Sequence, residues 1–161
     1  MTVKDMTKDP ANLTMRVTAE LAAPVERVWQ LWADPRQLER WWGPPTYPAT
    51  VVDHDLSPGG KVTYFMTGPE GETFHGWWHV LAVDAPRSLS VEDGFADEHG
   101  VPNDEMPTTT MSVELTADGD RTQMVMTSTF ESQEDMDRLA EMGMEDGLRE
   151  AMSQMDAILA D

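Results

Sequence analysis

The stretch from Ser132 to Asp161 constrains the fold most, because it contains no proline and its apolar and small residues recur at three- and four-residue steps. That spacing places them on one side of an α-helix, with charged residues mostly opposite. Ser132, followed three residues later by Asp135, is typical of a helix start. The sequence therefore predicts one long C-terminal helix of roughly 40 Å at about 1.5 Å per residue.

Two glycines lie on the predicted buried side of this helix, one turn apart. They are Gly143 and Gly147, and each costs a helix about 1 kcal/mol relative to alanine. Either another backbone approaches the helix closely at these positions, or a hollow remains between the helix and the surface it packs on. The sequence leaves both alternatives open.

The chain before residue 132 shows mainly the two-residue alternation of β-strands. Apolar and polar residues alternate strictly from Leu13 to Leu21, as in a half-buried strand. Two short helices are then predicted, ending at Asp34-Pro35 and at Gly43-Pro44. Further strands are predicted near residues 51–56, 61–67, 73–83, 88–92, 111–116 and 124–130. We expect residues 1–11 to be a flexible polar tail and residues 93–107 to be the longest loop.

Short turns between consecutive strands favour antiparallel pairing, and a single long terminal helix must cover one face of the resulting sheet. The predicted fold class is α+β. We expect a curved seven-stranded antiparallel sheet wrapped around the C-terminal helix, with two short helices after the first strand.

Composition excludes several classes of function. Eleven basic against thirty acidic residues give a net charge of −19, which repels phosphate backbones and anionic lipids, so we expect no nucleic-acid or membrane partner. The absence of cysteine excludes thiolate chemistry and fits a reducing cytoplasm. No apolar run reaches the length of a signal peptide or a membrane span, so a cytoplasmic location is predicted.

Several short motifs follow one another along the chain: Ala23-Pro24-Val25-Glu26-Arg27-Val28-Trp29, Asp34-Pro35, Trp41-Trp42-Gly43-Pro44, Pro58-Gly59-Gly60, His75-Gly76-Trp77-Trp78, Pro86-Arg87-Ser88-Leu89 and Gly143-Met144-Glu145-Asp146-Gly147-Leu148. Together they resemble the START-like, birch-pollen-allergen-like (SRPBCC) superfamily, in particular bacterial homologues of the activator of the Hsp-ninety ATPase (AHSA-like). The resemblance implies a helix-grip fold in a single START-like domain over residues 12–161. It does not imply one function, because the superfamily includes lipid carriers, hormone-binding proteins and polyketide cyclases. Ser57 departs from the pattern, since such relatives often carry a basic residue there.

Motifs for metal, cofactor and nucleophilic chemistry are missing. His75 and His79 have a chelating spacing only on a helix; on a strand they lie about 13 Å apart. The chain has no nucleophile elbow, P-loop or dinucleotide fingerprint. We therefore predict no metal, no cofactor and no assigned catalytic residue. Glu92, Asp93 and His75 remain an alternative acid–base set, as proposed for cyclase-like relatives.

Six tryptophans and thirteen methionines are the more informative residues. Methionine fills irregular space and adapts to varied ligands, so these residues form either a soft core or the walls of a cavity; we favour the cavity. Its entrance is assigned to Trp42 and Tyr64, with further ligand-binding positions at Met66, Phe74, His75, Trp78, Glu92, Met111, Met126, Met144, Gly147, Leu148 and Met152.

Three functions are consistent with the sequence. The preferred one is a non-catalytic protein that binds a small hydrophobic molecule or lipid between the sheet and the C-terminal helix. The second is a protein-interaction module that binds a chaperone or forms a homodimer. The third is a cyclase- or hydrolase-like enzyme that uses His75 and Glu92.

Overall fold

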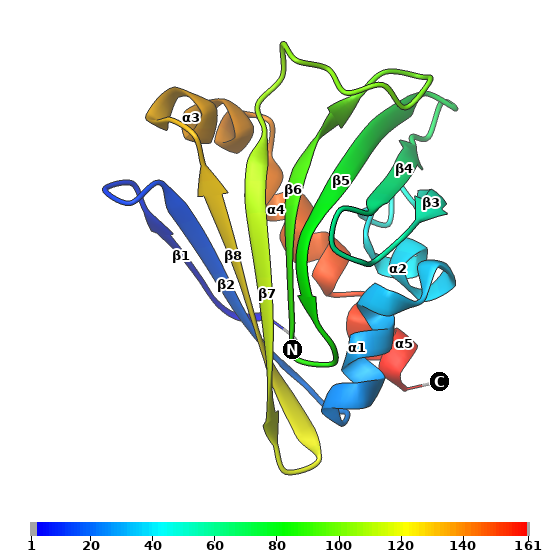
Figure 1. The fold of residues 1–161 in the computed structure, drawn as a ribbon, viewed down its shortest axis with the longest axis vertical. Coiled ribbons are helices and arrows are strands. Elements are labelled where there is room, and N and C mark those ends of the chain that lie inside the picture. The colour runs from blue at the N-terminus through cyan, green and yellow to red at the C-terminus, as the bar shows by residue number, and fades with distance from the viewer. Residues whose placement is uncertain (1–2, 161) are drawn as a thin grey trace.

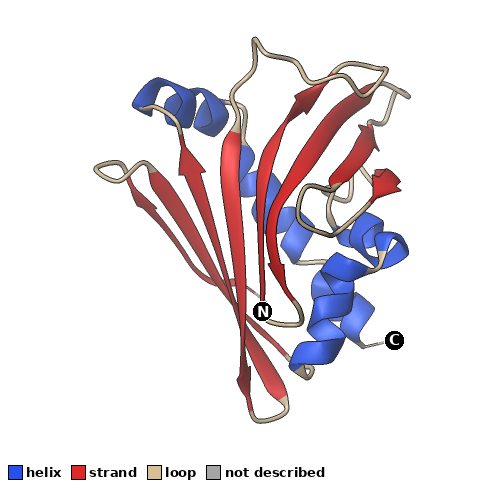
Figure 2. Cartoon of the chain, in the orientation of Figure 1, coloured by secondary structure: helices blue, strands red, loops and turns tan. Residues whose placement is uncertain are grey.

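The computed structural model describes residues 3–160, which form one eight-stranded sheet and five helices. The strands lie in the order β1-β2-β8-β7-β6-β5-β4-β3, and every neighbouring pair is antiparallel (Figures 1 and 2). Their bounds are β1 Val3–Asp9, β2 Thr14–Leu21, β3 Ala49–His54, β4 Lys61–Thr67, β5 Thr73–Asp84, β6 Ser88–Ala96, β7 Thr109–Asp118 and β8 Arg121–Phe130. The fold is α+β, as predicted, and is consistent with a helix-grip arrangement.

The expected number of seven strands is wrong, because residues assigned to a flexible tail form β1. This strand pairs with β2 from Val3 opposite Ala19 to Asp9 opposite Thr14. Its sequence gives little signal because an edge strand exposed on most positions needs few apolar residues; Val3 alone is fully buried. The turn that follows is fixed by a 2.6 Å hydrogen bond from Asn12 Nδ2 to Asp9 Oδ2.

The prediction of a single C-terminal helix is also wrong, since this segment forms three shorter helices. They are α3 (Gln133–Glu141), α4 (Met144–Met152) and α5 (Met155–Leu159). The predicted start is confirmed: the Ser132 hydroxyl accepts a 3.1 Å hydrogen bond from the Asp135 amide. Gly143 then adopts a left-handed conformation with φ +82°, which a right-handed helix cannot include.

Side-chain contacts hold the separate helices in place. Gln154, between α4 and α5, donates a 2.7 Å hydrogen bond to the Gly43 carbonyl. Lys8 of β1 forms a 2.6 Å ion pair with Glu145 of α4. Figure 1 shows α4 along one face of the sheet, with α5 beside α1.

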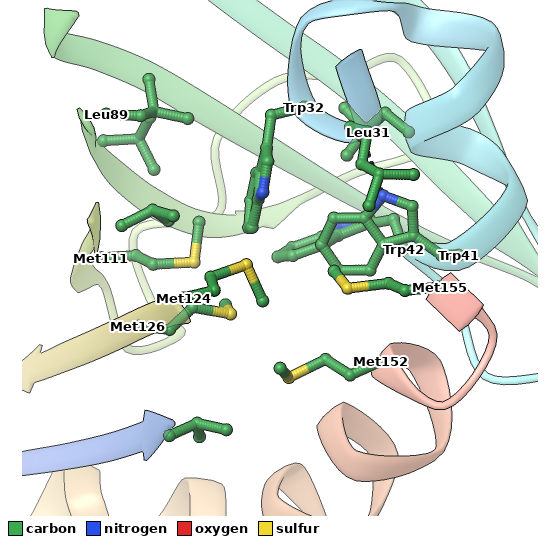
Figure 3. Packing of buried hydrophobic residues seen from close by; sticks show 14 of the residues in the cluster. Leu31, Trp32, Trp41, Trp42, Leu89, Met111, Met124, Met126, Met152 and Met155 are labelled. Carbon is green, nitrogen blue, oxygen red and sulfur yellow. Dashed lines mark hydrogen bonds between the residues drawn. The ribbon is translucent and has the colours of Figure 1, made fainter. Parts of the chain in front are cut away.

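The core lies between this face of the sheet and the helices. The short helices α1 (Val25–Ala33) and α2 (Pro35–Trp41) bring tryptophans to methionines from β7, β8 and the C-terminal segment (Figure 3). Trp32 and Trp41 meet edge to face at 4.7 Å between ring centroids, and Trp41 donates a 2.8 Å hydrogen bond to the Leu31 carbonyl. Much of the tryptophan content therefore serves packing.

Candidate ligand-binding cavity

A cavity of about 520 Å³ lies between the sheet and the segment that contains α3 and α4. Strands β4 to β8 form one wall, and the residues around Gly143 and Gly147 form the other. The connection from α2 to β3 adds Trp42, Pro44 and Tyr47 to the lining. The hollow thus lies between the sheet and the C-terminal segment, where a ligand site was expected.

The strands place side chains in this cavity by simple alternation. Residues two apart on a strand share a face, and pairs with this spacing line the cavity on β4, β5, β7 and β8: Tyr64 and Met66, Phe74 and Gly76, Thr109 and Met111, and Met126 and Ser128. Most of this lining is apolar, so the cavity suits the apolar part of a ligand.

The helical wall is thin because Gly147 has no side chain. A Cβ at this position would meet nothing beyond its own helix within 4 Å except Pro44 Cγ, at 3.9 Å. No backbone approaches closely, so of the two alternatives left by the sequence the structure favours a hollow. Gly143 differs from expectation: it is exposed and marks the break between α3 and α4.

Tyr64 and Asp93 form the polar part of the cavity. The Tyr64 hydroxyl donates a long hydrogen bond of 3.5 Å to Asp93 Oδ1. Tyr64 reaches β6 by lying across Gly76, its partner on β5; a Cβ at Gly76 would overlap the Cζ and Oη atoms of the phenol. A glycine at this position is what allows the two polar groups to meet.

Burial dominates the electrostatics of this pair. It raises the pKa of Asp93 to about 7, although the hydrogen bond from Tyr64 acts in the opposite direction. Burial, followed by the nearby Asp93 carboxylate, raises the pKa of Tyr64 well above its ordinary value. A carboxyl that titrates near neutrality is therefore present in a mainly apolar cavity.

Most predicted site residues line the cavity. Those that do are Trp42, Tyr64, Met66, Phe74, His75, Met111, Met126, Met144, Gly147 and Leu148. Trp42 and Tyr64, expected at the entrance, are instead buried, whereas Phe74 is 55% and Met142 53% exposed. The mouth therefore lies beside Phe74 and Met142, and Trp42 and Tyr64 belong to the floor.

Three predicted residues lie elsewhere. Trp78 and Met152 are buried in the core and do not line the cavity. Glu92 directly precedes Asp93 on β6 and therefore points to the opposite face of the sheet, where His79 and Thr110 are its register partners. These three positions do not contribute to the cavity wall.

The side chains of the alternative acid–base set, Glu92, Asp93 and His75, do not meet, because successive side chains on a strand point to opposite faces of the sheet. Asp93 lines the cavity and Glu92 does not. His75 contributes to the lining, but its ring stacks on Phe65 at 5.4 Å between centroids and lies 3.2 Å from Thr73 Oγ1. These partners are on the face of the sheet away from Tyr64, so His75 and Glu92 are not assembled around the cavity.

Sequence reasoning named Asp93 only in the alternative acid–base set and did not name Phe95, although a signal for both was present. Residues 93–107 were expected to be a loop, whereas β6 continues to Ala96. Asp93 and Phe95 continue the two-residue spacing of the buried residues Leu89 and Val91, and both line the cavity. Following that period would have placed the carboxylate on the cavity side.

Residues 3–160 contain neither a metal-binding cluster nor a helix suited to span a membrane. No three His, Asp or Glu side chains in this range gather as a group that would hold a metal ion. None of the helices in the same range has the length and apolar character needed to span a membrane.

Comparison with known proteins places the chain among bacterial relatives of the same shape. Protein Ms6760 from Mycobacterium smegmatis is 50% identical with a TM-score of 0.90, over 98% of this chain and 96% of that one. A protein from Arthrobacter aurescens is 52% identical with a TM-score of 0.95, over 99% and 92%. The AHSA1 protein from Silicibacter pomeroyi, 20% identical with a TM-score of 0.72 over 91% and 97%, shares the fold. No curated protein gave a significant match.

The family model for "Activator of Hsp90 ATPase homolog 1-like protein" matches residues 22–160. This range includes both short helices, the six strands β3 to β8 and the C-terminal helices. The match thus spans every element that lines the cavity. The chain belongs to the family of Activator of Hsp90 ATPase homolog 1-like proteins.

Proposed function

We propose that this protein binds a small, largely apolar molecule in the cavity between the sheet and α4, as a cytoplasmic binding protein without catalytic activity. The observation that carries the proposal is the cavity itself: about 520 Å³ lined mainly by apolar side chains. Ligand sites of roughly 300–1,000 Å³ with few polar groups are typical of small-molecule binding.

Burial of apolar surface would supply most of the affinity. At about 25 cal/mol per Å², a ligand that buries about 300 Å² gains roughly 7 kcal/mol before the cost of association. Met66, Met111, Met126 and Met144 line the cavity, and flexible thioethers adjust to different apolar shapes at little cost. These features support a ligand with a hydrocarbon body.

The enzyme alternative has less support. A general acid–base mechanism needs groups within hydrogen-bond reach of one reacting centre. Tyr64 is the hydrogen-bond partner of Asp93, and Glu92 lies on the other face of the sheet. The arrangement favours recognition of a ligand over its conversion.

Titration with a series of straight-chain alcohols tests the proposal. Binding near Trp42 should change tryptophan fluorescence and raise the melting temperature, with affinity increasing as the chain lengthens until the cavity is full. Gly147→Leu would project a side chain into the hollow and should weaken binding at least tenfold.

Ala140→Leu provides the matched control, because Ala140 is an exposed position on α3. This variant should bind the alcohols as the wild type does. If no alcohol binds, or if both leucine variants behave alike, cavity binding is wrong.

A protein partner is the second candidate, favoured by the exposed apolar side chains of Phe74 and Met142 beside the mouth and by the name of the family. Light scattering of the protein alone, and mixed with an Hsp90-type chaperone, distinguishes a homodimer from a chaperone complex. Phe74→Ser should weaken either association. A monomer in both samples contradicts this candidate.

A further inference from the structure

The part of the cavity wall that the structure describes contains one carboxylate and no lysine or arginine. Asp93 is the sole acidic residue among the described residues that line it. The only histidine in the lining is His75, whose ring lies against Phe65 and Thr73 rather than toward Asp93. Asp93 is therefore a carboxyl group without a cationic partner among the described residues of the cavity wall.

The elements packed around Asp93 also present no cation to it. On the neighbouring strands its register partners are Trp78 of β5 and Thr109 of β7. On the helical side, Arg149 of α4 contacts Met6 Sδ at 3.6 Å, and Arg138 of α3 donates to the Glu105 carbonyl at 3.3 Å. Within residues 3–160, Tyr64 is the titratable group that faces Asp93.

Asp93 keeps unused capacity for hydrogen bonds. An ionised carboxylate has about four acceptor positions, whereas the described hydrogen bond to this side chain is the 3.5 Å contact from Tyr64. The Tyr64 oxygen, while donating its proton to Asp93, can still accept a hydrogen bond. A donor group of a ligand would thus find two oxygens at the floor of a mainly apolar cavity.

Given the proposed function, on which this step rests, we propose that the preferred ligand is an amphipathic amine whose protonated nitrogen donates to Asp93 and to the Tyr64 oxygen. Its hydrocarbon body lies along the methionine-lined wall toward Phe74 and Met142. Opposite charges attract far more strongly in a low-dielectric cavity than in water. The net charge of −19 also draws cations to the protein and repels fatty acids.

Decylamine, decanol and decanoate test this proposal, because they share one hydrocarbon body and differ in the head group. Calorimetric titration at about pH 8.5, where Asp93 is ionised, should give an amine affinity at least tenfold above that of the alcohol. Decanoate should bind more weakly than either. At about pH 5.5 the amine should lose most of its advantage, since Asp93 is then protonated.

Two variants with the same change in net charge separate the cavity from the surface. Asp93→Asn should reduce the preference for decylamine over decanol to less than about threefold while decanol binding persists. Glu92→Gln removes the adjacent carboxylate on the opposite face and should keep the full preference. Circular dichroism shows whether each variant is folded. If a variant does not fold, the comparison of the three head groups on the wild-type protein still tests the proposal.

The outcomes are distinguishable. If none of the three probes binds, the proposed function fails. If decanol binds and decylamine binds no better, or if decanoate binds tightest, the amine proposal is overturned and cavity binding remains. Equal loss of preference in both variants would assign the amine to the acidic surface and also overturn the proposal.

Discussion

Gly76 lies directly opposite Tyr64 in the β4–β5 ladder, and the phenol ring of Tyr64 occupies the space where a side chain at position 76 would be. This relationship extends Tyr64 across one strand so that its hydroxyl reaches Asp93 on the next. The polar floor of the cavity thus depends on the absence of a single methyl group.

Gly76→Ala should therefore destabilise the fold and break the contact between Tyr64 and Asp93. An added methyl group in a packed site costs typically 1–3 kcal/mol, measurable by urea unfolding. In a Tyr64→Ala background the same substitution should cost much less, because the ring that it displaces is gone. An equal cost in both backgrounds would show that the clash with Tyr64 is not the cause.

Gly147 and Gly143 should respond oppositely to alanine. Gly147→Ala should stabilise the protein by about 1 kcal/mol, since the helix gains a better former and the new Cβ meets only Pro44 at 3.9 Å. Gly143→Ala should destabilise it by about 1–2 kcal/mol, because φ is +82° there. Thermal unfolding of both variants checks this; stabilisation by Gly143→Ala would contradict the helix break.

Asp93 should make the folded protein less stable as pH rises toward neutrality. Burial raises its pKa from an ordinary 3.8 to about 7. Between these values the folded chain holds a proton that the unfolded chain has released, so the free energy of unfolding falls with rising pH. Asp93→Asn should lack this fall, and its stability relative to the wild type should increase from about pH 4 to about pH 7. A constant difference across this range would contradict the raised pKa.

Ser132→Ala should remove the N-cap of α3. The Asp135 amide would lose its 3.1 Å partner, and loss of such a cap costs about 1 kcal/mol. Ser153→Ala is the control, because the Ser153 hydroxyl is exposed and bonds only to the Glu150 carbonyl of its own helix. Chemical denaturation should separate the two variants; equal effects would argue against a capping role.

The sequence predicted elements best where both the period and the turns were clear. Strand β4 has its predicted bounds, Lys61–Thr67, because glycine-containing turns flank an alternating run. Strand β6 was ended too early because Gly94 looked like the start of a loop. In the structure Gly94 is a strand residue that makes room for Trp77, whose Cζ2 would lie 2.6 Å from an added Cβ.

The break in the C-terminal helix could not be predicted from the spacing of its apolar residues alone. Met136 and Leu139 of α3, like Met144 and Leu148 of α4, turn toward the core or the cavity, so the apolar spacing continues across the break. A glycine in a helical pattern is compatible with either continuation or termination. The predicted location of the cavity depended less on whether the helix is continuous or broken at Gly143, because the same residues face inward in both arrangements.

The ion pair between Lys8 and Glu145 joins the first strand of the chain to the helix that closes the cavity. Arg149 reinforces this connection through its contact with Met6. Trimming the amino end back to Leu13, where the sequence first looks ordered, would remove both anchors of α4. A shortened protein of that kind would have a loosened cavity wall, and ligand measurements made on it would describe a different receptor.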